Sequence, residues 1–354
     1  MRGHLLNLLS LSPDRSAREF DWKTLLELAE DQCVTGLALQ GAQALPATDW
    51  PPRRILLPWI GCAEAIRRQN RRVNAAMLHF VAEMEERGLH PLIVKGQVIA
   101  QEYTDPLLRQ PGDIDVFFER SDWKGVERWL IEKKMPHSCG AAERHIEIVY
   151  EGIPVELHYH LNHFSSSRSM SYWQREVEEK AWERSRTAWV DGVKVRTLGV
   201  TDTLAYLLVH AHHHLLTEGV GLRQLLDMAH FIHNHKEEVD LSLLHHHLRG
   251  IGYEKAFSAF VALSRKYLGL PKDEMPCEPD MRDDVYADKV MEDVWSGGNF
   301  GHKNNLKGVR SGLLHSLNTA RLVLAHSVRF YRLAPAEARA YGWHKIFWRM
   351  GRRA

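Results

Sequence analysis

The sequence lacks the features that mark several classes of protein. Its four cysteines, Cys33, Cys62, Cys139 and Cys277, lie far apart, which leaves no C-x-x-C pair and no dense disulfide framework. No apolar run approaches the roughly 18 residues that a membrane-spanning helix needs. The opening residues contain no small-residue cleavage site of the kind that follows a signal peptide. We therefore expect a cytoplasmic protein with reduced thiols and no transmembrane segment.

An excess of charge of either sign is also absent. Lysine and arginine total 46 and aspartate and glutamate total 45, so the formal net charge is +1. A balance this even gives no global reason to expect nucleic acid or an anionic membrane as a partner. The abundant residue is histidine, with 22 copies among 354 residues, which raises the question of a metal site or a pH sensor.

Hydrophobic periodicity divides the chain into three regions: a helical one over 1–90, one with strands over 91–200, and a helical one over 201–354. The stretch 58–87 predicts a long amphipathic helix, and we interpret its arginines as a solvated face rather than a nucleic-acid contact. In the middle region, short β-prone runs cover residues 91–94, 113–118, 145–150, 153–161 and 189–198. These patterns predict an α+β fold, with a small mixed β-sheet between N-terminal and C-terminal helical regions.

The middle region carries a candidate metal site. On a strand, residues i and i+2 project to the same face, so Asp113 and Asp115 can reach one cation. A D-x-D pattern arises about once by chance in a chain of this size, so context is needed. Glu156, His158 and His160 alternate along another β-prone run, which makes Glu156 a candidate third ligand, although a solvated outward face is an open alternative. Three carboxylates facing one cleft require cations, and Mg²⁺ suits such oxygen ligands, with Mn²⁺ as a second choice.

Two basic residues near this pattern are candidates for phosphate binding. The segment around Lys95 and Gly96 predicts a strand, a turn and then a helix over 97–103. A glycine at a helix start lets a phosphate approach backbone N–H groups, and Lys95 adds a positive charge. Arg109, in a loop flanked by prolines, can bind phosphate oxygens through two N–H groups, although a surface arginine is the simpler interpretation.

A resemblance to a known family supports these candidates. It is carried by the segments LIVKGQVIAQEYTDPLLRQPGDIDVFF and, about 40 residues later, IPVELHYHL. Together they resemble the uncharacterised bacterial nucleotidyltransferase family of the DNA polymerase beta-like superfamily, and the likeness extends more loosely to about residue 235. The resemblance implies a nucleotidyltransferase core over 91–200, with Asp113 and Asp115 as metal ligands and Glu156 as the third carboxylate. It also implies that His210, His214, Arg223 and Asp227 lie on helices beside the nucleotide cleft. The expected nucleotide-binding residues are Lys95, Gly96, Arg109, Gly112, His158, Arg223 and Asp227.

We therefore expect a Mg²⁺-dependent nucleotidyltransferase that moves an NMP from an NTP to an unidentified acceptor and releases pyrophosphate. The acceptor could be a protein side chain, a sugar or a small metabolite, and one carboxylate or His158 could deprotonate it. The alternative is a non-catalytic member that binds a nucleotide or a partner within a biosynthetic or regulatory system. For the histidines that follow residue 200, we favour packing or substrate contact over a zinc site. For the aromatic and basic tail 341–354, we favour docking on the protein over contact with a membrane surface.

Overall fold

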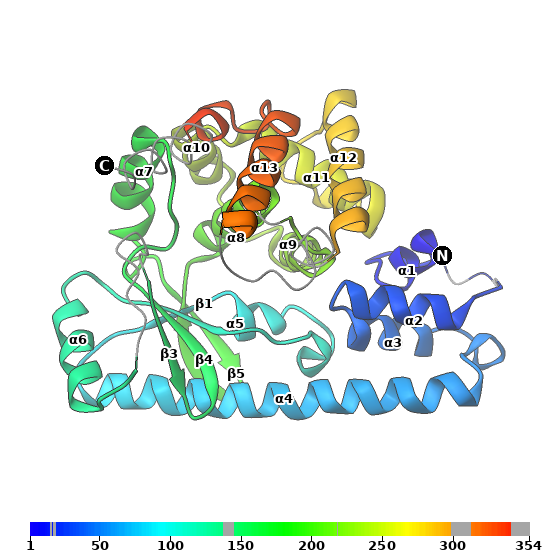
Figure 1. The fold of residues 1–354 in the computed structure, drawn as a ribbon, viewed down its shortest axis with the longest axis horizontal. Coiled ribbons are helices and arrows are strands. Elements are labelled where there is room, and N and C mark those ends of the chain that lie inside the picture. Colours follow the sequence, from blue (N-terminus) through cyan, green and yellow to red (C-terminus); the bar gives the residue numbers. More distant parts are fainter. Residues whose placement is uncertain (15, 17–18, 137–144, 218, 299–312, 341–354) are drawn as a thin grey trace.

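The computed structural model describes residues 1–14, 16, 19–136, 145–217, 219–298 and 313–340, and of residues 313–320 it describes the backbone alone. It confirms the expected α+β class, with a small mixed sheet among helices (Figure 1). The strands are β1 (Leu92–Val94), β2 (Ile114–Phe117), β3 (His145–Tyr150), β4 (Ile153–His158), β5 (Arg186–Val190) and β6 (Val193–Thr197). The expected division into three domains stays a prediction.

The main sheet has the strand order β1-β2-β4-β3. Strands β2 and β4 are parallel, whereas β1 pairs with β2 and β3 pairs with β4 in antiparallel fashion. The predicted hairpin is confirmed, because β3 and β4 are joined through Glu151 and Gly152, both with positive φ. The run 189–198 does contribute strands, but β5 and β6 form a separate two-stranded sheet.

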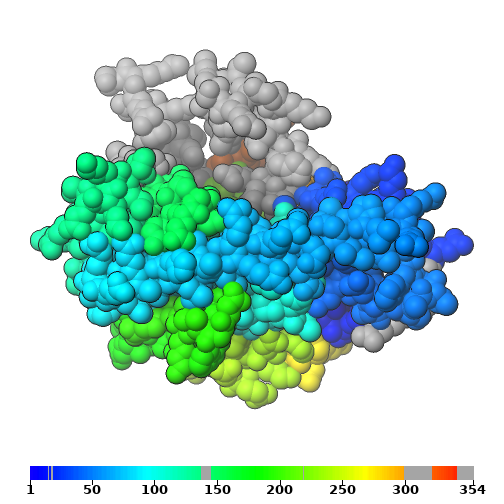
Figure 2. All heavy atoms as spheres, turned by 90° about the horizontal axis from the view of Figure 1, so that it is seen from below, coloured from blue at the N-terminus to red at the C-terminus, as the bar shows by residue number. Residues whose placement is uncertain are grey.

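The N-terminal helices are α1 (Arg2–Leu8), α2 (Trp22–Asp31), α3 (Thr35–Gln43) and α4 (Arg53–Glu86), with the short turn η1 (Ala47–Asp49). Asp21 caps α2 by accepting a hydrogen bond from the Thr24 N–H. Helix α4 confirms the predicted long amphipathic helix and passes beneath both the sheet and α1 to α3 (Figure 1). Figure 2 shows the molecule from below, where α4 runs across the surface.

Along the chain, the other helices either alternate with the strands or follow the last of them, and those that follow lie on the opposite side of the sheet from α4 (Figure 1). The helices that alternate with the strands are α5 (Gly96–Ala100), η2 (Pro106–Leu108), α6 (Trp123–Glu132), α7 (Ser167–Trp173) and the π-helical turn η3 (Gln174–Glu178). Those that follow are α8 (Val200–Thr217), α9 (Leu222–His235), α10 (Leu241–Ile251), α11 (Glu254–Leu268), η4 (Lys272–Glu274), α12 (Met281–Gly297) and α13 (Leu313–Arg329). Within the described ranges, no helix is long and apolar enough to cross a membrane.

An aromatic cluster joins α4 to the sheet. Phe80 of α4 is fully buried, and its ring centroid lies 5.5 Å from that of Trp129 and 5.3 Å from that of Tyr150. On the same helix, Glu83 accepts hydrogen bonds from Trp129 Nε1 at 2.9 Å and from the Tyr150 hydroxyl at 3.0 Å. Because Trp129 belongs to α6 and Tyr150 to β3, these contacts hold the sheet on the long helix.

Candidate active site

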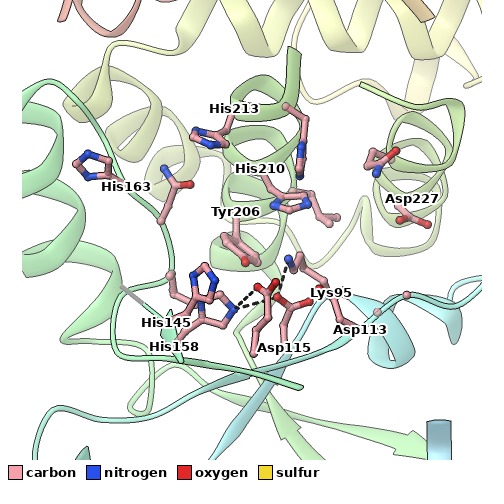
Figure 3. Close-up of a pocket in the computed structure, with 18 of the residues that line it drawn as sticks. Lys95, Asp113, Asp115, His145, His158, His163, Tyr206, His210, His213 and Asp227 are labelled. Atoms are coloured by element: carbon pink, nitrogen blue, oxygen red, sulfur yellow. Dashed lines mark hydrogen bonds and ion pairs between the residues drawn. The ribbon is translucent and has the colours of Figure 1, made fainter. Parts of the chain in front are cut away.

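A cavity of about 960 Å³ lies between the main sheet and helices α8 and α9 (Figure 3). Every site residue expected from the sequence lines it. These residues are Lys95, Gly96, Arg109, Gly112, Asp113, Asp115, Glu156, His158, Arg223 and Asp227. The cavity is also lined by residues that sequence reasoning did not single out for the site, among them His145 and Tyr206.

The three carboxylates converge because of the strand register. Asp115 on β2 stands directly beside Glu156 on the parallel strand β4, and Asp113 immediately precedes β2. One carboxylate oxygen from each of Asp113, Asp115 and Glu156 lies within 4.8 Å of the other two. Such a set of oxygen atoms fits a divalent cation such as Mg²⁺, which prefers carboxylate ligands.

Asp115 forms two ion pairs. Its Oδ1 lies 2.7 Å from Lys95 Nζ and 3.0 Å from His158 Nε2, and the residue is only 2% exposed. His158 Nε2 also lies 3.2 Å from Glu156 Oε2. A metal ion that binds Asp115 must therefore compete with a lysine and a histidine that already balance its charge.

The surroundings shift the pKa values of two of the carboxylates in opposite directions. Repulsion from Asp115, followed by burial, raises the pKa of Asp113 to about 6. Burial alone would raise the pKa of Glu156, but the hydrogen bond and charge of His158 and the charge of Lys95 lower it to about 2. Burial opposes protonation of His158, whereas its hydrogen bonds to Asp115 and Glu156 raise its pKa. Crowded negative charge at Asp113 is the electrostatic condition that a bound cation would relieve.

Lys95 reaches the site from an unusual backbone conformation. Its φ is +57°, and Gly96 follows with φ of +49°, so the chain turns sharply between β1 and α5. The Asp115 carboxylate counters the effect of burial and raises the pKa of Lys95. The helix after this turn has five residues and ends at Ala100, earlier than the expected 97–103. The chain leaves the helix there, and the Tyr103 hydroxyl then donates to Asp227 Oδ1 at 2.7 Å.

Arg109 lies at the cavity wall, where its guanidinium forms an ion pair. Its Nε and one terminal nitrogen donate to the two oxygens of Asp227, each at 2.7 Å, and both residues are buried. Burial would raise the pKa of Asp227, but Arg109 lowers it. From α4, the Asn70 side chain donates to the Leu107 and Arg109 carbonyls at 2.7 and 2.9 Å. These bonds fix the loop that leads into Asp113. Phosphate binding by Arg109 stays a prediction, since the ion pair gives it a positioning role.

Arg223, on α9, contacts the same loop. Its terminal nitrogen donates to the Gln110 carbonyl at 2.8 Å and more weakly to the Pro111 carbonyl at 3.4 Å. Gly112 follows these residues, and a Cβ there would lie 3.8 Å from an Arg223 terminal nitrogen. Helix α9 thus supplies both Arg223 and Asp227 to the segment before Asp113, and their role in nucleotide binding stays a prediction.

The wall opposite the carboxylates is formed by α8. It carries Tyr206, His210 and His213, which face the cavity from above the carboxylates (Figure 3). Burial, with repulsion from Lys95 as a further cause, lowers the pKa of His210 well below its usual value, and burial lowers that of His214 to about 3. These two imidazoles are therefore neutral at physiological pH and offer hydrogen-bonding groups without charge.

His160 differs from the sequence expectation. Strand β4 ends at His158, so His160 lies beyond the strand that carries Glu156. Its Nδ1 lies 2.7 Å from Glu178 Oε2, and Glu178 also accepts the Leu161 N–H at 2.8 Å. Glu178 therefore holds the segment just after β4 through the His160 side chain and the Leu161 backbone.

His145 and Tyr206 were missed for different reasons. His145 starts β3, and the hairpin register places it directly opposite His158. That register could have been counted from the turn at Glu151 and Gly152, and it is the signal that would have found His145. Tyr206 lies on a helix whose contact with the sheet has no local signal in the sequence.

Comparison with known proteins adds a family. The sequence model of a family described as uncharacterised nucleotidyltransferase matches residues 18–269. No curated protein matches the chain. Among solved structures, an antigenic nucleotidyltransferase-like protein from Paracoccidioides brasiliensis is similar at 10% identity, over 60% of this chain and 93% of that chain, with a TM-score of 0.36. That structural likeness is too slight to carry an argument. The family match spans well over half of the sequence, and the chain belongs to the uncharacterised nucleotidyltransferase family.

Proposed function

We propose that this protein is a Mg²⁺-dependent nucleotidyltransferase that transfers an NMP from an NTP to an acceptor and releases pyrophosphate. The observation that carries the proposal is the convergence of Asp113, Asp115 and Glu156 in a cavity that also contains Lys95. Membership of the family supports a nucleotidyltransferase-type activity. Mn²⁺ is the second metal that this set of oxygen ligands would accept.

Asp113, Asp115 and Glu156 would hold the metal, which supplies positive charge against the triphosphate and the developing charge on the leaving pyrophosphate. Lys95, whose Nζ lies 2.7 Å from Asp115 Oδ1, would contact the phosphates with its positive charge. An acceptor oxygen or nitrogen then forms a bond to the α-phosphorus as the bond to the β-phosphate oxygen breaks.

The acceptor's proton would pass to a cavity carboxylate, because His158 already holds a proton in its ion pair with Asp115. A general base must lie within hydrogen-bond reach of the proton that it removes. Arg109 and Asp227 would act through position, since their ion pair fixes the loop before Asp113. The acceptor would be a protein side chain, a sugar or a small metabolite. The neutral imidazoles of His210 and His214 could form hydrogen bonds with an uncharged group of that acceptor.

The test compares carboxylate variants. Asp113→Asn and Asp115→Asn should abolish NMP transfer from a labelled NTP to components of a cell extract, with unchanged circular dichroism. Asp273→Asn is the matched control, because Asp273 is exposed in η4. Wild-type turnover in either site variant would contradict the proposal. Calorimetric binding of an NTP without transfer to any acceptor would favour the alternative, a non-catalytic nucleotide-binding member.

A further inference from the structure

A second group of metal-binding side chains adjoins the three carboxylates. His145 on β3 and His158 on β4 stand directly opposite each other in the antiparallel register. One nitrogen from each and one oxygen of Glu156 lie within 4.8 Å of one another. Figure 3 shows the two imidazoles side by side, next to Asp115. This arrangement combines two nitrogen ligands with one oxygen ligand.

This set of ligands differs in chemistry from the carboxylate group. Mg²⁺ prefers oxygen ligands and keeps its water, whereas imidazole suits ions such as Zn²⁺ and Fe²⁺. Two histidines and one carboxylate also form the protein ligands of known catalytic zinc sites and of non-haem iron sites. Two kinds of ion could therefore be sorted between adjacent positions by the identity of the ligand atoms.

We propose that His145, His158 and Glu156 form a site for a divalent transition-metal ion of the Zn²⁺ class, separate in ligand chemistry from the Asp113 and Asp115 site. Glu156 has two carboxylate oxygens and belongs to both groups, so it can bridge the two positions. The proposal goes beyond nucleotidyl transfer, because the reaction proposed above uses Mg²⁺ and does not require an ion of the Zn²⁺ class.

The burial of the ligands suits an ion with an exchangeable position. The side chain of His158 is 9% exposed, and those of Glu156 and His145 are 25% and 26% exposed, so the group opens to the cavity on one side. Three protein ligands leave a coordination position for water or another molecule, as in catalytic rather than structural zinc sites.

Glu147 would orient one of the ligands. Its Oε1 lies 3.4 Å from His145 Nε2, and the residue stands directly opposite Glu156 across β3 and β4. Carboxylates that bond the second nitrogen of a ligating histidine fix its ring and raise its basicity. Nε2 is the His145 nitrogen near Glu147, so Nδ1 would remain to bind the ion.

The test uses Co²⁺ as a spectroscopic probe for the Zn²⁺ class. The full-length chain, stripped of metal with a chelator, is titrated with Co²⁺ in excess Mg²⁺, and the visible absorption of bound Co²⁺ is recorded. One equivalent should bind, and added Zn²⁺ should displace it. His145→Ala and the milder His145→Gln should each weaken Co²⁺ binding by at least about tenfold, since even the loss of a residue that only hydrogen-bonds a metal ligand costs that much.

Two controls separate this site from its neighbours. His79→Ala removes an exposed histidine that also pairs with a carboxylate, Glu151 at 3.1 Å, and it should leave Co²⁺ binding unchanged. Asp113→Asn should keep the Co²⁺ spectrum even where it abolishes NMP transfer, so the two proposals can fail independently. Absence of bound Co²⁺ in excess Mg²⁺, or unchanged affinity in both His145 variants, would overturn the inference.

Discussion

At the scale of single residues, Asp115 organises the candidate site through its neighbours. It lies between Lys95 and His158 and beside Glu156, and it is almost fully buried. A buried carboxylate is tolerated only when its charge is matched, which the lysine and the histidine accomplish. The same contacts balance the charge of Asp115 within the fold.

The ion pair between Arg109 and Asp227 gives a prediction at this scale. Removing one member of a buried pair leaves the other charge without a partner, so Asp227→Asn should lower the free energy of unfolding by about 3 to 5 kcal/mol. Replacing both, as in Arg109→Met with Asp227→Leu, should restore much of that loss. Urea denaturation monitored by circular dichroism measures both effects.

The same variants separate two roles for Arg109. If it acts mainly by position, the double variant should fold and still bind an NTP, with weakened transfer because the loop before Asp113 is less well held. Loss of NTP binding in the double variant, with the stability of Asp227→Asn unchanged from wild type, would instead assign Arg109 to direct phosphate contact.

At the scale of secondary-structure elements, the long helix α4 supports the sheet that carries the carboxylates. Phe80 packs against Trp129 and Tyr150, and Asn70 holds the loop before β2. The position of Asp113 and Asp115 therefore depends on a helix that contributes no side chain to the cavity lining. Mutations on α4 should change activity through stability and geometry rather than through lost contacts to substrate.

Phe80→Ala tests this support. Emptying a fully buried aromatic position should lower the free energy of unfolding by about 3 to 5 kcal/mol, because contacts are lost and a cavity is left. Leu57→Ala is the control on the same helix, since Leu57 is 54% exposed and its loss should change stability by less than about 0.5 kcal/mol. Equal denaturation midpoints for the two variants would contradict the assignment of the core.

A histidine and a carboxylate join α9 to the segment after α5 in a pH-dependent contact. His235 Nε2 lies 2.9 Å from Glu102 Oε1, and Nδ1 lies 2.8 Å from Glu238 Oε1, with Arg186 also near Glu102. Burial opposes protonation of His235, but its hydrogen bonds to Glu102 and Glu238 raise its pKa above the usual 6.5. Burial would raise the pKa of Glu102, but its contact with His235 lowers it. Glu102 therefore stays charged at the pH values at which His235 titrates.

The sign of the pH effect follows from the raised histidine pKa. Its contribution to stability is fully present below the unfolded-state pKa and is lost as pH rises through the folded-state pKa. His235→Gln should therefore lower the free energy of unfolding by about 1 to 2 kcal/mol near pH 6 and by clearly less near pH 9. His245→Gln, at an exposed position on α10, should have little effect at either pH. An equal loss at both pH values for His235→Gln would contradict this account.

At the scale of the whole molecule, the sequence predicted local features better than their assembly. The α+β class, the long helix and the hairpin follow from periodicity and turn residues, which act over a few positions. The pairing of β2 with β4 does not, because Asp115 and Glu156 are brought together by a parallel register between distant segments. The ion pair of Arg109 with Asp227 spans 118 positions and has no local signal either.

The sequence identified candidate residues that belong to a motif. It missed residues that only packing brings into the cavity. Asp113, Asp115 and Glu156 belong to the segments that carry the family resemblance, and the structure places them in one cavity. Tyr206 and His145 line the same cavity because of helix packing and strand register, neither of which a motif encodes. The predicted role of the tail 341–354 lies outside the described residues, as does Cys139.

The central claim is that the α-phosphoryl group of an NTP, with its nucleoside, moves to an acceptor. The most direct measurement incubates the protein, Mg²⁺ and a cell extract with ATP, GTP, CTP or UTP labelled at the α-phosphate, and in parallel with the same nucleotides labelled at the γ-phosphate. The account predicts that label from the α-position of at least one NTP enters an acceptor, while label from the γ-position appears in pyrophosphate. Incorporation from the γ-position, or from neither position with all four nucleotides, would contradict it.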